Sequence, residues 1–131
     1  MHNGKIAYFE DSTVLAASTV RGIELFSDDR HQVVAQAANR GGALAVLDQI
    51  ASGEVDANIV LSDGNLDGGV TGGDAIIIIN RIKELGLNVR TVLMSSQSAE
   101  DIGVTVDAEF LKDDSGPADL VKILDDLPEI E

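Results

Sequence analysis

Acidic, hydroxyl and ammonium side chains follow four apolar segments of the sequence. Glu10 and Asp11 follow the first segment, Asp63 the second, Ser95 the third and Lys112 the last. Carboxylates brought close together repel one another unless a cation joins them, and a ligand set made only of oxygen suits Mg²⁺. A metal ion beside a carboxylate, with a hydroxyl and an ammonium group nearby, suits phosphoryl transfer, which depends mainly on positioning and electrostatics. The residue types therefore predict a magnesium site with phosphoryl chemistry, provided that the fold brings the segments together.

The hydrophobic pattern indicates how these segments are arranged. Short apolar runs without polar alternation are typical of strands buried on both faces of a parallel sheet. We expect five strands, at residues 5–9, 31–37, 58–62, 91–94 and 108–112. Helical apolar stripes lie between or after them, at residues 20–26, 43–50, 75–85 and 120–127. This alternation predicts an α/β fold, a doubly wound five-stranded parallel sheet with helices on both faces, and a single domain over residues 1–131.

In such a sheet the functional site lies beyond the carboxyl ends of the strands. Each polar residue taken alone has a simpler interpretation, because Asp63 before a glycine suits a turn and Ser95 suits a helix cap. Their joint placement at successive strand ends favours a shared site. One carboxylate must then be the nucleophile, and Asp63 is the best choice because it lies on the central strand, between the acidic pair and the Ser95–Lys112 pair.

Composition excludes several classes of function. The chain has 131 residues and a formal net charge of −14, which argues against binding to nucleic acid or to an anionic membrane surface. There is no cysteine, so disulfides and thiol chemistry are excluded. No apolar run reaches the roughly 18 residues of a membrane span, and the first residues lack the pattern of a signal peptide. We therefore expect a cytoplasmic protein.

Four segments together resemble the receiver domain of two-component response regulators. They are residues 8–11 (Tyr-Phe-Glu-Asp), 59–66 (Ile-Val-Leu-Ser-Asp-Gly-Asn-Leu), 92–96 (Val-Leu-Met-Ser-Ser) and 110–112 (Phe-Leu-Lys). The resemblance covers essentially the whole chain and implies a flavodoxin-like sheet with strand order 2-1-3-4-5. It also implies a single-domain receiver without an output domain.

The resemblance implies a role for each site residue. Asp11 would bind Mg²⁺ directly and Glu10 mainly through water, while Asp63 and the backbone carbonyl of Asn65 would complete the protein's ligands. Asp63 would be the phosphoacceptor. A hydrogen bond from Ser95 and an ion pair with Lys112 would then stabilise the phosphoryl group.

The implied partners are a histidine kinase or a phosphotransfer protein as donor and an unidentified downstream protein as target. The protein would then be an autocatalytic phosphoryl acceptor with slow self-dephosphorylation, and would not be a turnover enzyme.

Some positions depart from the family pattern. Asp113 follows Lys112 where the family usually has proline, and Glu109 stands where the family usually has its switch aromatic, one residue before Phe110. The segment from Ser95 to Lys112 is short for the family, which predicts a fourth helix of one or two turns. We therefore expect the activation chemistry to be intact and the signalling surface to be unusual.

Two alternatives remain open at this stage. A receiver-like interaction module that is never phosphorylated would fit the altered fifth strand and the short fourth helix. A small Mg²⁺-dependent phosphoryl-transfer enzyme would use the same clustered carboxylates. The glycine-rich segment 64–73 is either an ordinary loop or one that moves when the site is occupied.

Overall fold

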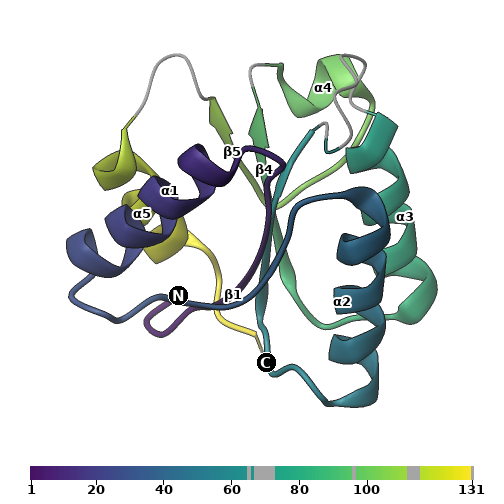
Figure 1. Ribbon diagram of the computed structural model, residues 1–131, viewed down its shortest axis with the longest axis horizontal. Helices are drawn as coiled ribbons and strands as arrows, with labels where there is room; N and C mark the ends of the chain where they lie inside the picture. Colours follow the sequence, from purple (N-terminus) through teal and green to yellow (C-terminus); the bar gives the residue numbers. More distant parts are fainter. Residues whose placement is uncertain (65, 67–72, 96, 112–115, 131) are drawn as a thin grey trace.

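A computed structural model of the protein shows one parallel sheet with helices on both faces (Figure 1). The structure describes residues 1–64, 66, 73–95, 97–111 and 116–130. Within these ranges the strands are β1 (Lys5–Phe9), β2 (Gln32–Ala37), β3 (Ile59–Asp63), β4 (Arg90–Ser95) and β5 (Ala108–Leu111). The helices are α1 (Thr13–Phe26), α2 (Arg40–Ser52), α3 (Gly73–Leu85), α4 (Ala99–Ile102) and α5 (Pro117–Asp126). The strand order is β2-β1-β3-β4-β5, which confirms the predicted doubly wound fold.

The central strands are buried as their apolar sequences predict. All five residues of β3 are buried, and so are the residues of β1 after Lys5. The edge strand β2 alternates between exposed and half-buried residues, because its successive side chains point to opposite faces of the sheet. Because side chains alternate between the two faces of a strand, β1 contributes Ile6 and Tyr8 to one core cluster and Ala7 and Phe9 to the other.

Helices α1 and α5 lie side by side on one face of the sheet, and α2 and α3 lie on the other (Figure 1). The first pair approaches closely at Gly22 of α1, where an added Cβ would come within 2.6 Å of the Cβ of Pro117. Any larger side chain at position 22 would therefore push α5 away from α1. None of the helices in the described ranges is long and apolar enough to cross a lipid bilayer.

Local signals set the helix ends. The Ser12 hydroxyl accepts a hydrogen bond from the Leu15 N–H at the start of α1, and the Asn39 side chain caps α2 in the same way. Gly53 adopts a left-handed conformation after α2 (φ 86°), which glycine does without strain. Pro117 is the first residue of α5, where its missing N–H costs nothing. Helices α2 and α5 therefore begin about one turn before their apolar stripes.

A polar contact joins α5 to the chain just before β2. His31 was expected to begin that strand, but it lies one residue before it and is completely buried. Its Nδ1 accepts a hydrogen bond from the Gly4 N–H (2.9 Å), so the neutral ring carries its proton on Nε2, which lies 2.7 Å from Oδ1 of Asp125. Arg30 also binds Asp125 through both of its terminal nitrogens, at 2.6 and 3.2 Å.

The fourth helix is short, as the sequence predicts. Helix α4 has four residues and packs through Ala99 and Ile102 against Leu93 of β4 and Ala75 of α3. Its N-cap is Ser98, whose hydroxyl accepts a hydrogen bond from the Asp101 N–H. Helix α4 therefore forms a single helical turn.

Candidate functional site

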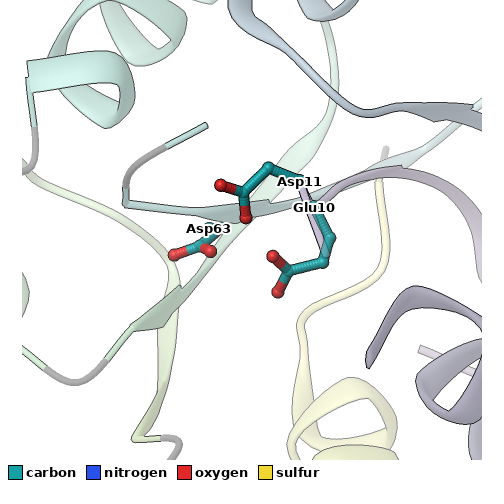
Figure 2. A group of neighbouring side chains, drawn as sticks. All are labelled: Glu10, Asp11 and Asp63. Carbon is teal, nitrogen blue, oxygen red and sulfur yellow. The ribbon is translucent and has the colours of Figure 1, made fainter. Parts of the chain in front are cut away.

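Three carboxylates meet at the carboxyl edge of the sheet, as the sequence predicts. One oxygen each from Glu10, Asp11 and Asp63 can be chosen so that all three lie within 4.8 Å of one another. Figure 2 shows the three side chains converging from β3 and from the residues that follow β1. Glu10 and Asp63 are buried, whereas Asp11 is exposed. Like charges this close favour a bound cation, and the three oxygen donors fit a hard ion such as Mg²⁺.

Pairing of β1 with β3 brings these carboxylates together. Phe9 is in register with Ser62, so the residues that follow each of them leave the sheet next to one another. The Glu10 N–H donates to the Ala37 carbonyl (3.0 Å), which continues the pairing with β2 by one residue. Asp63 is the last residue of β3, so its backbone is fixed by the ladder while its side chain reaches the edge of the sheet.

Ser95 lies beside this cluster, on the neighbouring strand. Asp63 is in register with Met94, and Ser95 is the next residue. A Cβ added to Gly64 would lie 3.1 Å from the Ser95 hydroxyl oxygen, so the chain leaving β3 passes directly against Ser95. That oxygen accepts a hydrogen bond from the Gln97 N–H (3.1 Å), and its own O–H remains a donor for a further group.

Two of the predicted site residues, Asn65 and Lys112, lie outside the described residues. The same is true of Asp113 and of most of the glycine-rich segment, residues 67–72. The structure therefore brings together Glu10, Asp11, Asp63 and Ser95.

Asp74 is a part of the site region that the sequence analysis missed. This buried carboxylate, in the first turn of α3, accepts a hydrogen bond from the Leu66 N–H (2.7 Å) and lies 3.5 Å from Nη1 of Arg40. The Ala75 N–H also donates to the Gly64 carbonyl. These bonds fix the chain just after Asp63. The sequence did contain a signal for this role. Asp74 directly precedes the predicted helix, and a carboxylate is stabilised at a helix N-terminus.

A buried tyrosine lies beneath the acidic cluster. Tyr8 of β1 is 1% exposed. Its hydroxyl has no partner with hydrogen-bond geometry among the described residues. Burial raises the pKa of Tyr8 well above its usual range, and the charges of Glu10 and Asp63 act in the same direction. The neighbouring Thr19 side chain acts in the opposite direction and lowers the pKa of Tyr8.

The fifth strand differs from the pattern of the family that the sequence resembles. The side chain of Phe110 is buried in the core, while the carboxylate of Glu109 accepts a hydrogen bond from the Ala99 N–H. Glu109 thus binds the first residue of α4. An aromatic side chain at position 109 could not make this contact.

Comparison with known proteins identifies the fold. No family model and no curated protein sequence matches the chain. Solved structures do match it, among them the response regulator RcsB of Salmonella typhimurium, with 20% identity and a TM-score of 0.70 over 95% of this chain. The phosphorylated cyanobacterial phytochrome response regulator RcpA has 21% identity and a TM-score of 0.67 over 93% of this chain. The REC domain of AraT, a response regulator from Geobacillus stearothermophilus, has 19% identity and a TM-score of 0.66 over 95%.

These proteins differ in how much of their length the chain spans. It covers 60% of the RcsB chain, but 89% of RcpA and 92% of the AraT domain. The common part is the five-stranded parallel sheet with its flanking helices. The chain therefore has the flavodoxin-like fold of response regulator receiver domains.

Proposed function

We propose that this protein is a receiver module of a two-component phosphorelay, phosphorylated on Asp63 with Mg²⁺ and signalling through protein contact. The observation that carries the proposal is the gathering of the Glu10, Asp11 and Asp63 carboxylates at the carboxyl edge of a receiver-type sheet. The similarity to receiver domains supports a signalling module in general. One of the similar structures, RcpA, is itself phosphorylated.

Three carboxylates and one backbone carbonyl would hold the metal. Glu10, Asp11 and Asp63 supply the carboxylates, and the carbonyl of Asn65 would complete the protein's share. A bound Mg²⁺ would neutralise the acidic cluster and would supply a positive charge for an oxygen of the incoming phosphoryl group. The partial burial of the cluster favours this arrangement, because carboxylates removed from water are stable only with a counter-charge.

Asp63 is the group that forms the new bond. One of its carboxylate oxygens attacks the phosphorus of a phosphohistidine in the donor protein, and the P–O bond forms as the P–N bond breaks. The donor imidazole leaves with the electron pair of the broken bond. The Ser95 hydroxyl donates a hydrogen bond to the transferred group, and Lys112 pairs with its negative charge. Water later cleaves the acyl phosphate slowly, so the protein acts as an acceptor and not as a turnover enzyme.

The partners follow from this chemistry. The donor would be a histidine kinase or a phosphotransfer protein, and the target would be another protein. With such partners the chain would act in the cytoplasm. The formal net charge of −14 argues against direct contact with nucleic acid or with an anionic membrane.

One observation favours a second candidate, an interaction module that is never phosphorylated. Glu109 binds the first residue of α4 through its carboxylate. This contact ties together the two elements between which a receiver would transmit its signal. A module held in a single state would keep this contact whether or not the acidic edge is occupied.

Incubation with Mg²⁺ and acetyl phosphate, followed by intact mass and amide spectra, tests the proposal. We expect the wild-type chain to gain one phosphoryl group and Asp63→Asn to gain none. The matched control is Asp28→Asn, because Asp28 is exposed and follows α1 at the opposite end of the sheet. Phosphorylation that persists in Asp63→Asn would refute the assignment of the acceptor. An inert chain whose spectrum ignores both Mg²⁺ and beryllofluoride would favour the interaction module, and steady turnover of a phosphate ester would favour an enzyme.

A further inference from the structure

Two hydrogen bonds hold the chain just after β3. The Gly64 carbonyl accepts a hydrogen bond from the Ala75 N–H (3.2 Å). Two residues later, the Leu66 N–H donates to Oδ2 of Asp74 (2.7 Å). Asp74 and Ala75 both lie in the first turn of α3, and Leu66 is buried in the core cluster that includes residues of α2 and α3. The first turn of α3 therefore holds the segment that directly follows Asp63.

Asp74 is a buried carboxylate whose two oxygens face different groups. The residue is 7% exposed, and while Oδ2 accepts the bond from Leu66, Oδ1 lies 3.5 Å from Nη1 of Arg40, the first residue of α2. Burial of a carboxylate costs free energy unless the group is paired and hydrogen-bonded. An exposed acid would stabilise the start of a helix equally well. The burial of Asp74 against Leu66 therefore needs another explanation.

The N–H group that Asp74 binds shares a peptide unit with a proposed metal ligand. The Leu66 N–H and the Asn65 carbonyl belong to the same peptide bond. The peptide bond is planar, and in its trans form the N–H and the carbonyl point in opposite directions. A partner that fixes the direction of the N–H therefore also fixes the direction of the carbonyl. An anionic acceptor further polarises the peptide unit, which makes the carbonyl oxygen a better ligand for a hard cation.

We propose that Asp74 is a positioning residue for the metal site, because its carboxylate directs and polarises the peptide unit that carries the Asn65 carbonyl. This inference rests on the proposed function, in which that carbonyl binds Mg²⁺. Asp74 acts through the peptide unit and does not itself bind the metal. Partners that orient a metal ligand in this way typically contribute roughly 10- to 100-fold to the affinity for the metal.

Titration of the full chain with Mg²⁺, followed by amide spectra, tests the proposal without a phosphoryl donor. Asp74→Ala removes the acceptor of the Leu66 N–H, so we expect Mg²⁺ to bind about tenfold more weakly than to the wild type. Asp74→Asn removes the charge but keeps an acceptor oxygen, so it should retain more of the affinity than Asp74→Ala. This partial rescue distinguishes a directed hydrogen bond from a general effect of charge.

The matched control is Asp48→Ala. Asp48 is an exposed residue of α2 that pairs with Arg81 of α3, so this variant also removes one acid and one ion pair between the same two helices. We expect it to bind Mg²⁺ like the wild type. If Asp74→Ala does not fold, Asp74→Ser replaces it, because serine suits the start of a helix and its oxygen is one bond closer to the backbone than Oδ2.

Hydrogen exchange in metal-free buffer checks the contact itself. The Leu66 amide should exchange faster in Asp74→Ala than in the wild type, because it loses its acceptor. An equal exchange rate would show that the bond is absent in solution and would overturn the inference.

Two results of the titration would overturn the inference and leave the proposed function intact. One is an unchanged dissociation constant for Mg²⁺ in Asp74→Ala, which would reduce Asp74 to a structural role. The other is an equal loss of affinity in Asp74→Ala and Asp74→Asn, which would assign the effect to charge alone. Failure of the proposed function is distinguishable from both, because the wild type would then show no response to Mg²⁺, and that result would overturn both proposals.

Discussion

Replacing Asp11 with asparagine should change stability in opposite directions with and without Mg²⁺. Asp11 is the exposed member of the acidic cluster, and asparagine keeps its size and shape. Without metal the substitution removes two repulsive pairs, one with Glu10 and one with Asp63. With Mg²⁺ it removes one of the ligands. Thermal unfolding in each condition therefore gives two results of opposite sign from one variant.

The size of the effect follows from the geometry. The oxygens lie within 4.8 Å of one another, so each pair of charges costs about 0.9 kcal/mol in a water-like dielectric and more if the site is drier. Two pairs give roughly 1.7 kcal/mol, which physiological salt reduces to about 1 kcal/mol over this distance. For a domain of this size, that gain corresponds to a melting temperature about 3–5 °C higher in metal-free buffer. Saturating Mg²⁺ at about one hundred times its dissociation constant would stabilise the wild type by about 2.7 kcal/mol.

The assay is thermal unfolding of the wild type, Asp11→Asn and Asp28→Asn, in chelator and in Mg²⁺. Asp28→Asn measures the general benefit of removing one negative charge from a chain of net charge −14. We expect Asp11→Asn to be more stable than both other proteins in chelator and to gain less than either on addition of Mg²⁺. A variant that is destabilised in chelator and responds to Mg²⁺ like the wild type would refute both the repulsion and the ligand assignment.

Further predictions concern contacts outside the acidic cluster. Asp125→Ala leaves the buried Nε2–H of His31 without an acceptor and removes the ion pair with Arg30. Urea titration should therefore show a loss of about 1–3 kcal/mol in the free energy of unfolding. An unchanged midpoint would contradict the assigned contact. The hydrogen bond from Arg30 lowers the pKa of Asp125. The stability that Asp125 contributes should therefore be present above the unfolded-state pKa of about 4 and be lost as the pH falls through the lower folded-state value. Asp125→Asn should remove this part of the acid sensitivity, measured as unfolding free energy against pH. Glu109→Ala removes the acceptor for the Ala99 N–H, so hydrogen exchange at that amide should be faster than in the wild type, and an equal rate would exclude the contact in solution.

The strands of the sheet could be predicted because their signals are local, whereas the strand order was implied by the resemblance to receiver domains. Apolar runs at residues 5–9, 58–62 and 91–94 have no polar alternation, and the structure pairs them as the central strands. Carboxyl ends of parallel strands meet at one edge whatever the details of packing. The closeness of Glu10, Asp11 and Asp63 therefore followed from strand assignment alone, and the structure confirms it.

Other contacts could not be predicted because they depend on which helices pack together. Asp74 accepts a hydrogen bond from the Leu66 N–H, eight residues earlier. No sequence pattern indicates that these two residues should meet. The partners of His31 lie 27 and 94 residues away, on segments with no pattern that pairs them. The place of Asp63 at a strand end could thus be predicted from the sequence. The contacts around it could not, because they depend on tertiary packing.

The two edges of the sheet use charge differently, and this explains why the predicted substitutions have opposite signs. At the amino edge, where the strands begin, cations pair with acids and hold the loops in place; these pairs are Lys5–Asp56, Arg30–Asp125 and Arg90–Asp107. At the carboxyl edge there is also one such pair, Arg40–Asp74, but three further carboxylates converge beside it. Removing an acid from the amino edge should therefore lower stability, whereas removing Asp11 from the carboxyl edge should raise it until metal is added. Three like charges within 4.8 Å of one another repel, and a bound cation would relieve that repulsion.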